Sequence, residues 1–332
     1  MQPVRWGILS TAKIAKTKVI PGMLKSAELR VAAIASRDLS RAEAAARELG
    51  IPKAYGSYEA LLADPEIEAV YNPLPNDQHV ALTIAAARAG KHVLCEKPFA
   101  MNAAGIAPLI AMKPAVLIAE AFMIRHHPQW IRAREIIASD EIGELKSVQA
   151  AFSYFNADPA NIRNRLETGG GALMDIGCYA LMSGRLLFGA DPARVIALID
   201  SDPAFRTDRH VSGLADFGAG RQLSFSVSTQ AAPYQRVLAL GTKGRVEIII
   251  PFNAPQGEAT LIYTDTGAQH GDGSRQAVMI PPADQYQLQA EAFSRAIRGA
   301  EPLAAGLEDA LLNMRILDAM ARSEKSGAWE RP

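Results

Sequence analysis

Short apolar runs alternate with amphipathic stretches over about the first 120 residues of the chain. This pattern is typical of repeated strand-helix-strand units and predicts a parallel sheet. Strands are expected at residues 5–9, 30–35, 69–72, 92–95 and 116–119. Helices are expected between them at residues 13–24, 40–49, 58–63 and 79–89, the last ended by Gly90 as a C-terminal cap. The pattern predicts a doubly wound nucleotide-binding fold.

Beyond residue 122 the alternation is strand-like with few helices, which predicts a mostly antiparallel sheet. The expected strands cover residues 145–155, 195–200, 211–217, 222–229, 236–241 and 245–250, and the expected helices cover 130–138, 171–187, 286–298 and 307–322. Because 332 residues exceed what one core usually covers, two domains are expected, at 1–122 and 123–332. Their cleft is the expected active site.

Composition narrows the class of partner. Lys plus Arg (35) equals Asp plus Glu (35), so no overall field would attract nucleic acid or an anionic membrane, and a small ligand is expected. The N-terminus lacks a signal-peptide pattern, and no stretch of about 20 apolar residues is free of charge. Cys95 and Cys178 are too few for a disulfide framework or a zinc site, which favours a reducing cytoplasm. Adjacent His126 and His127 point in different directions, so no metal is expected.

The turn after the first expected strand has the position of a dinucleotide fingerprint. It reads Gly7-Ile8-Leu9-Ser10-Thr11-Ala12-Lys13-Ile14-Ala15, and alignment puts the three fingerprint glycines at Ser10, Ala12 and Ala15. None is glycine, but all are small. The hydroxyls of Ser10 and Thr11 and the amides of the following helix could bind phosphate.

The end of the second expected strand bears on the choice of cofactor. A ribose-recognising residue is expected there, and the sequence has Ser36-Arg37. Arg37 offers a guanidinium to a 2′-phosphate, and Arg41, one turn into the next helix, could join it, so NADP is favoured over NAD. The alternative is that these are ordinary solvated arginines.

Lys97 follows a buried strand in the run His92-Val93-Leu94-Cys95-Glu96-Lys97-Pro98. Since proline ends the strand, the lysine is held at the carboxyl edge of the sheet, where ligands bind in such folds. An ammonium there could donate a proton or stabilise a phenolate. The alternative is a simple pair with Glu96.

A run of three glycines, Gly169 to Gly171, precedes a helical segment that carries Asp175 and Tyr179. Glycines allow a backbone to approach a ligand closely. The two polar side chains stand one turn apart on one face, where such a pair is usually an ordinary hydrogen bond.

These motifs resemble those of the Gfo/Idh/MocA (glucose-fructose oxidoreductase / inositol dehydrogenase) family. The motifs are GILSTAKIA, YNPLPNDQH, AGKHVLCEKP, AEAFMIRHHPQ and GGGALMDIGCY, with STQ and GTKGRVEI further along. The resemblance implies a Rossmann domain and an α/β domain with a large open sheet that mediates homodimer or homotetramer contacts. It also implies a Lys97-Pro98 bond that is often cis. Many relatives in the family have histidine at the position of Tyr179, and tyrosine there resembles the sugar and dihydrodiol branch.

The resemblance assigns roles to residues. Tyr179 is the expected acid/base and Lys97 its electrostatic partner, while Asp175, Arg163 and Phe155 are expected to bind substrate. The residues expected to contact the dinucleotide are Gly7, Ser10, Thr11, Ala12, Ile14, Ser36, Arg37, Arg41, Leu74, Asn76, His79, Glu96, Lys97 and Arg163.

The expected function is an NADP-dependent oxidoreductase that acts on a carbinol or carbonyl carbon of a sugar or polyol, similar to xylose dehydrogenase. Two alternatives stay open: a trans-dihydrodiol dehydrogenase, and a non-catalytic regulator that senses NADP or a sugar. The chain lacks the export segment and arm of glucose-fructose oxidoreductase, so NADP is expected to exchange rather than stay bound.

Overall fold

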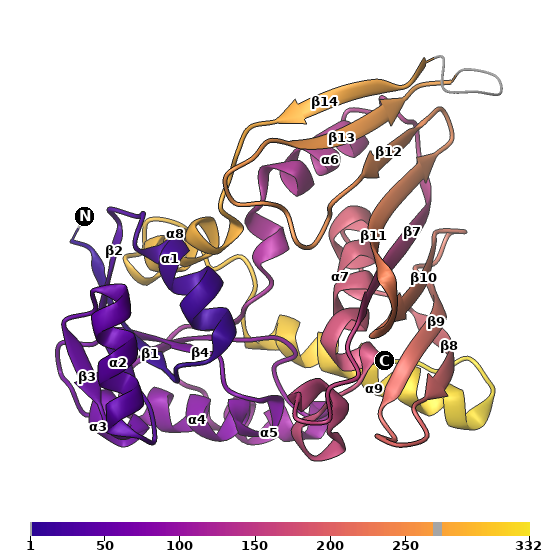
Figure 1. The fold of residues 1–332 in the computed structure, drawn as a ribbon. Coiled ribbons are helices and arrows are strands. Elements are labelled where there is room, and N and C mark those ends of the chain that lie inside the picture. The colour runs from indigo at the N-terminus through magenta and orange to yellow at the C-terminus, as the bar shows by residue number, and fades with distance from the viewer. Residues whose placement is uncertain (1, 268–273) are drawn as a thin grey trace. The chain divides into compact units, whose positions relative to one another are not determined.

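A computed structural model describes residues 2–267 and 274–332, and Figure 1 labels its elements. The chain forms two compact units. The first contains the residues up to Met123 together with Asp284–Leu311, and the second contains Ile124–Ala283 and Leu312–Pro332. This division differs from the single boundary expected after residue 122, because a late segment belongs with the first unit.

The described residues of the first unit form a six-stranded parallel sheet in the order β3-β2-β1-β4-β5-β6. This is the strand order of the Rossmann fold, which confirms the expected fold. The strands are β1 (Val4–Leu9), β2 (Leu29–Ala35), β3 (Lys53–Tyr55), β4 (Ala69–Asn72), β5 (His92–Cys95) and β6 (Ile118–Glu120). Periodicity predicted all of these except β3, which has only three residues.

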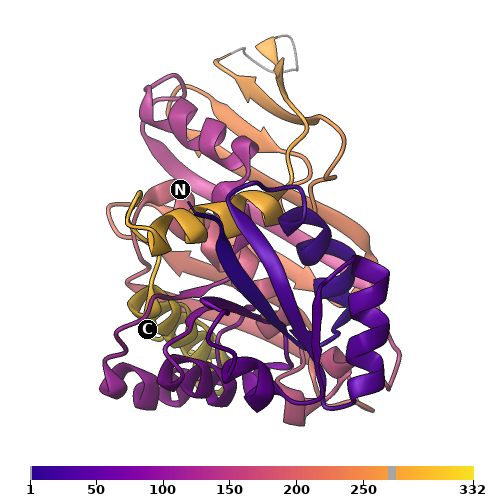
Figure 2. The ribbon, with the colours of Figure 1, turned by 90° about the vertical axis from the view of Figure 1, so that its left-hand side faces the viewer.

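Helices flank this sheet, as Figures 1 and 2 show. They are α1 (Ile20–Met23), preceded by the π-helical turn η1 (Ala15–Val19), then α2 (Leu39–Leu49), α3 (Tyr58–Leu62), α4 (Asn76–Arg88), α5 (Ala103–Met112) and α8 (Gln285–Ile297). Helix α2 begins at an Asp38 cap and ends at Gly50, which has a left-handed φ of 68°. Helix α5 was not predicted, because its sequence is apolar with little periodicity.

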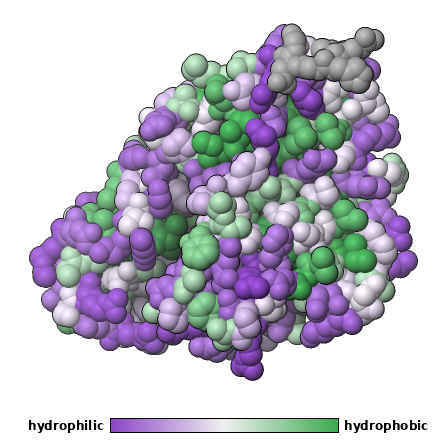
Figure 3. All heavy atoms as spheres, turned by 45° about the vertical axis from the view of Figure 1, so that its right-hand side comes forward, coloured by the Kyte–Doolittle hydropathy of each residue, from purple (hydrophilic) through white to green (hydrophobic). Residues whose placement is uncertain are grey.

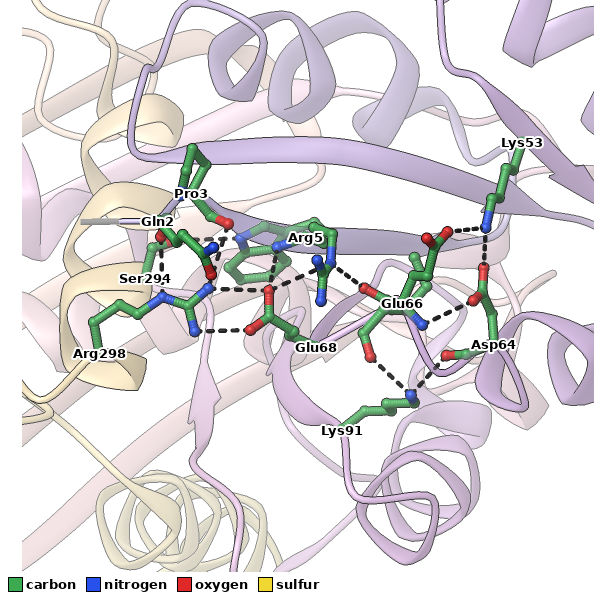
Figure 4. A network of polar contacts seen from close by, with 12 residues as sticks. Gln2, Pro3, Arg5, Lys53, Asp64, Glu66, Glu68, Lys91, Ser294 and Arg298 are labelled. Atoms are coloured by element: carbon green, nitrogen blue, oxygen red, sulfur yellow. Dashed lines mark hydrogen bonds and ion pairs between the residues drawn. The ribbon is translucent and has the colours of Figure 1, made fainter.

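Helix α8 packs against α1 and β2, although both elements lie far from it in the sequence. Arg298, just after the helix, pairs with both carboxylate oxygens of Glu68 at 2.8 and 3.0 Å, and Trp6 donates to the Ser294 hydroxyl at 3.1 Å (Figure 4). In the same network the buried ammonium of Lys91 donates to the carbonyls of Asp64 and Ile67. These contacts bring residues 284–311 into the first unit.

The described residues of the second unit form an eight-stranded sheet in the order β14-β13-β12-β11-β7-β10-β9-β8. Strands β7 and β10 pair in parallel, and the other neighbouring strands described in this sheet pair antiparallel, so the sheet is mostly antiparallel, as expected. The strands are β7 (Leu145–Phe155), β8 (Arg194–Ser201), β9 (Asp208–Asp216), β10 (Gln222–Ser228), β11 (Gln230–Gly241), β12 (Arg245–Ile248), β13 (Thr260–Asp265) and β14 (Gln276–Ile280). The last two were not predicted.

Helices α6 (Pro128–Ala138) and α7 (Cys178–Phe188) cover one face of this sheet. Three short 3-10 turns, η2 (Met123–His126), η3 (Ile162–Asn164) and η4 (Leu166–Thr168), and the π-helical turn η5 (Leu173–Gly177) also occur. Helix α9 (Leu307–Ser326) closes the chain, with residues from Leu312 onward grouping with the second unit.

The other face of the sheet carries exposed apolar side chains among polar ones. Leu198 is 77% exposed and Met279 is 71% exposed, and Leu214 is partly exposed beside Leu198. Figure 3 shows hydrophobic and hydrophilic side chains interspersed on this side of the molecule. Side chains alternate along β7, so Phe152 and Tyr154 point to the helix-covered face while Ala151 and Ser153 point to the open one.

Candidate active site

The turn after β1 has the backbone of a dinucleotide fingerprint without its glycines. Ser10 has a φ of 111°, a region that side chains rarely adopt and that glycine adopts freely. Its N–H donates to the Ala35 carbonyl at 2.9 Å, and its hydroxyl accepts the N–H of Ala12 at 3.0 Å. The neighbouring Thr11 and Ile14 are partly exposed. The geometry of this turn therefore fits a dinucleotide phosphate at the start of the following helix.

At Gly7, packing against a neighbouring helix requires the absence of a side chain. A Cβ at this position would lie 2.6 Å from Cδ2 of Leu61, which is fully buried. The residue therefore lets α3 pack against β1. Its contact with the cofactor stays a prediction.

The end of β2 brings two arginines to one tyrosine. Ser36 is buried, and its hydroxyl accepts the Asp38 N–H at 3.3 Å. Arg37 and Arg41 are exposed. Burial raises the pKa of Tyr58, while Arg37 and Arg41 act to lower it, so both guanidiniums lie near the Tyr58 phenol. Two cations close together and open to solvent fit a bound phosphate.

His79 holds the loop after β4 rather than lining a surface. Its side chain is fully buried, with Nδ1 2.9 Å from the Pro98 carbonyl oxygen and Nε2 2.6 Å from that of Leu74. A neutral imidazole can donate to one of these oxygens. Burial lowers the pKa of His79 below its ordinary value. The residue thus joins the loop of Leu74 and Asn76 to the turn that follows Lys97.

Lys97 is half-buried at the carboxyl end of β5, and the Lys97–Pro98 peptide bond is cis, as the resemblance implied. The carboxylate of Glu96 accepts the Tyr71 hydroxyl at 2.6 Å and the backbone N–H of Lys97 at 3.3 Å. Tyr286 of α8 lies near this carboxylate, and burial followed by the charge of Glu96 raises the pKa of its phenol. Sequence reasoning missed Tyr286, since it lies almost 190 positions beyond Lys97.

In the second unit, other atoms of the protein lie close to the backbone of Gly170 and Gly171. A Cβ on Gly170 would lie 2.4 Å from the Arg163 carbonyl oxygen, and one on Gly171 would lie 2.0 Å from Oδ1 of Asp208. The N–H of Gly171 donates to the same Arg163 carbonyl at 2.9 Å. The expected approach of these glycines to a ligand is therefore replaced, at Gly170 and Gly171, by close contacts within the unit.

Asp208 caps the helix that follows the glycines. Its carboxylate accepts the N–H of Leu173 at 2.5 Å and also that of Ala172. Burial nevertheless raises the pKa of Asp208. The helix begins with the π-helical turn η5, a local widening that the sequence pattern did not predict.

Asp175, in η5, is the centre of a polar cluster. Its Oδ2 accepts the Tyr154 hydroxyl at 2.5 Å and Nε of Arg163 at 2.9 Å. The Asp175 side chain is 13% exposed and that of Arg163 is 43% exposed. Burial and then Asp175 raise the pKa of Tyr154, and Asp175 raises that of Arg163. Tyr154 was missed because a strand pattern assigns it to the core.

Tyr179 lies one turn after Asp175 and is buried in an aromatic cluster. Its ring is 6.1 Å from that of Phe152 and 5.6 Å from that of Phe252, and these two phenylalanines stack at 4.7 Å. Phe155, at the end of β7, is 67% exposed. A phenol, a carboxylate and a guanidinium thus gather beside aromatic rings in the second unit.

The residues described contain no group of three or more side chains able to hold a metal ion, and none of their helices meets the length and hydropathy needed to cross a bilayer. Cys95 and Cys178 are both buried, and neither is in a disulfide. Burial raises the pKa of Cys95 well above its usual value.

A Rossmann unit of this strand order, with a lysine at its carboxyl edge, defines a nicotinamide-dependent oxidoreductase. The chain belongs to the GFO/IDH/MocA family. The family model "Oxidoreductase family, NAD-binding Rossmann fold" matches residues 4–114, and the "GFO/IDH/MocA C-terminal domain" matches residues 130–247. The expected family, enzyme class and cofactor type are confirmed.

Known proteins resemble the chain over most of its length. It is 48% identical to an uncharacterized oxidoreductase, ORF334, of Rhizobium meliloti (99% of each chain), and 41% identical to D-xylose 1-dehydrogenase (NADP(+)) 2 of Haloferax volcanii (97% and 98%). It is 35% identical to trans-1,2-dihydrobenzene-1,2-diol dehydrogenase of Sus scrofa (76% of each). The structure of the 3-ketoreductase KijD10 from Actinomadura kijaniata, in complex with NADP and TDP-benzene, matches with a TM-score of 0.89 at 28% identity, covering 97% and 98% of the chains.

The burial of His79 predicts a pH dependence of stability. The folded chain resists protonation at this imidazole, whereas the unfolded chain takes up a proton near the ordinary pKa of 6.5. The free energy of unfolding should therefore decrease as the pH falls below about 6.5. His79→Gln should reduce this decrease, as measured by denaturant unfolding at ~pH 7 and ~pH 5. His210→Gln, at an exposed position, is the control and should keep the wild-type slope. Equal slopes in His79→Gln and the wild type would contradict the prediction.

Proposed function

We propose that this enzyme transfers a hydride between NADP and a carbinol or carbonyl carbon of a sugar or polyol, as an aldose dehydrogenase or reductase similar to xylose dehydrogenase. The observation that carries the proposal is the polar cluster of Asp175 and Arg163 one turn from the Tyr179 phenol. Such a cluster can bind hydroxyl groups beside a proton-transfer group. The similarity to an NADP-dependent D-xylose dehydrogenase over 97% of the chain supports it.

NADP, when bound, supplies the hydride acceptor or donor. The turn formed by Ser10, Thr11 and Ala12, followed by Ile14, is proposed to bind its pyrophosphate through backbone amides. Arg37 and Arg41, which lie near Tyr58, are proposed to bind the 2′-phosphate. The remaining expected contacts are Gly7, Ser36, Leu74, Asn76, Glu96, Lys97 and Arg163, while the buried His79 is proposed to act only by holding the loop of Leu74 and Asn76.

Tyr179 is proposed to take the proton from the substrate hydroxyl during oxidation and to return it during reduction. The ammonium of Lys97 would stabilise the phenolate form, since an opposite charge nearby favours the ionised state. Asp175, Arg163 and the exposed Phe155 are proposed to bind the substrate.

A trans-dihydrodiol dehydrogenase is the second candidate. The aromatic side chains around Tyr179 and the exposed ring of Phe155 suit an apolar ring that carries two hydroxyls. The 35% identity to a dihydrodiol dehydrogenase supports it. Turnover of a panel of aldoses, polyols and trans-dihydrodiols with NADP decides between the two. Tight NADP binding with no turnover of any of them would favour a regulator.

We also propose that the open face of the second unit's sheet joins copies of this chain into a homodimer or homotetramer. Leu198, Leu214 and Met279 expose apolar surface there, and exposed apolar patches often mark interfaces. The two buried thiols support a reducing cytoplasm as the compartment.

Two variants test the proposed proton transfer. Lys97→Ala and Tyr179→Phe should each lower kcat by about 100-fold or more. The first removes the ammonium proposed to stabilise the phenolate, and the second removes the hydroxyl proposed to transfer the proton. The affinity for NADP, measured by fluorescence titration, should change little. Tyr234→Phe, on an exposed tyrosine, is the control. Wild-type kcat in Tyr179→Phe would refute the role of this phenol.

Arg37→Ala tests the choice of cofactor. The KM for NADP should rise by about 10-fold or more, since a charge-assisted contact to phosphate is lost, while the KM for NAD should stay nearly constant. Steady-state kinetics with both cofactors measure this. Equal effects on both would rule out the 2′-phosphate role.

Leu198→Asp tests the proposed interface. A charge in an apolar contact should shift the protein toward smaller species in sedimentation velocity. Leu24→Asp, at an exposed leucine of the first unit, should leave the distribution unchanged. A wild-type protein that sediments only as a monomer would disprove the proposal.

A further inference from the structure

The surroundings of Tyr179 oppose the phenolate that its proposed role requires. Its ring is enclosed by Phe152 and Phe252, and an apolar environment disfavours a charged phenol. The carboxylate of Asp175, one turn before it, adds a negative charge that acts in the same direction. Besides the charge proposed for Lys97, a cation within the second unit would therefore favour the phenolate at moderate pH.

Arg163 is placed to supply that charge. Its Nε donates to Asp175 Oδ2 at 2.9 Å, so the guanidinium lies beside the helix that carries Tyr179. The charges of Arg163 and Tyr179 interact, and by reciprocity a guanidinium that is stabilised by a phenolate stabilises that phenolate in turn.

Three contacts hold the backbone of Arg163 in place, and the pair with Asp175 holds its guanidinium. The backbone of Arg163 lies against Gly170, where no Cβ would fit, and its carbonyl accepts the N–H of Gly171. Its N–H donates to the side chain of Asn161 at 3.1 Å. On the other side, Tyr154 donates to the same Asp175 oxygen and so offsets part of the carboxylate charge.

We propose that Arg163 is a positioning residue that acts through Tyr179: a guanidinium bound by Asp175, whose carboxylate also accepts the Tyr154 hydroxyl, stabilises the Tyr179 phenolate from within the same structural unit. This role differs from the direct contact with substrate or cofactor expected for Arg163. It rests on the proposed function of Tyr179 as the acid/base.

Other charged or titratable groups surround this helix in the second unit. Besides Arg163 they are Tyr154 from β7, His127 before α6, Asp208 at the start of β9, and Asp175, Cys178 and Arg185 of the helix itself. Arg185 is a second permanent cation, but it lies in the last turn of the helix, where it binds Asp191 and Asn313. Arg163 is the permanent cation that binds Asp175, one turn from Tyr179.

The decisive variant is Arg163→Gln. Phenolate formation is followed by ultraviolet absorbance as the pH rises, and subtraction of the same titration with Tyr179→Phe in each background isolates the Tyr179 signal. The midpoint should move up by about one pH unit or more in Arg163→Gln. With NADP and D-xylose as the probe, kcat/KM for oxidation should fall about 10-fold at neutral pH and recover as the pH rises through the new midpoint.

Matched variants separate charge from shape. Arg163→Lys keeps a cation and should keep the midpoint near that of the wild type. Arg165→Gln removes an arginine two residues away whose Nε donates to the Pro159 carbonyl at 3.4 Å, and it should leave the midpoint unchanged. The double variant Arg163→Gln, Asp175→Asn should move the midpoint part of the way back, because it removes the uncompensated carboxylate.

An unshifted Tyr179 midpoint in Arg163→Gln would overturn the inference, whatever the loss of activity. If this variant does not fold, Arg163→Met replaces it, since methionine keeps an unbranched side chain without the charge: the Tyr179 midpoint should again move up, and no increase would overturn the inference. Since the absorbance titration needs no substrate, a failure of D-xylose to react would count against the proposed function alone.

Discussion

The close approach of backbone at Gly170 and Gly171 is the constraint on which the second unit's polar cluster depends. Neither position has room for a Cβ: one lies against the Arg163 carbonyl and the other against the Asp208 carboxylate. The two contacts join a 3-10 turn, the start of β9 and the first turn of a helix at one point. Arg163, whose backbone lies at this point, donates to Asp175. The helix that begins there places Tyr179 in the aromatic cluster.

The turn after β1 in the first unit also requires an unusual backbone conformation, but the residue that adopts it is not glycine. Ser10 adopts a φ of 111°, a conformation that costs a residue with a side chain about 1–3 kcal/mol. Two hydrogen bonds, to Ala35 and from Ala12, hold it there. The dinucleotide turn is thus specified by backbone geometry, and a search for glycine alone would miss it.

Much of the fold could be predicted because hydrophobic periodicity is local. The parallel strands except β3 and the strands from β7 to β12 follow from it. Periodicity could not predict that residues 284–311 belong to the first unit, since contacts such as that of Trp6 with Ser294 join positions 288 apart. Strands β13 and β14 were also missed. The motifs predicted that Asp175 and Tyr179 lie one turn apart on a helical segment, but they did not predict the partners of Asp175. Strand alternation places Tyr154 in the core, and nothing in the local sequence indicates that its hydroxyl donates to Asp175.

The backbone contacts of the glycine run also determine where charged side chains lie in the second unit. Asp208 sits at the amino end of the helix, where backbone N–H groups and the helix dipole favour a negative charge, yet burial raises its pKa and Asp175 raises it further. Two carboxylates thus interact with one another at the start of the helix that carries Tyr179, and the Arg163 guanidinium is bound directly to one of them. Because all three groups are held by the same backbone contacts at Gly170 and Gly171, the charge at this end of the helix depends on packing as much as on the identity of the charged residues. A motif that first suggests room for a ligand therefore also fixes where charge is placed one turn from the Tyr179 phenol.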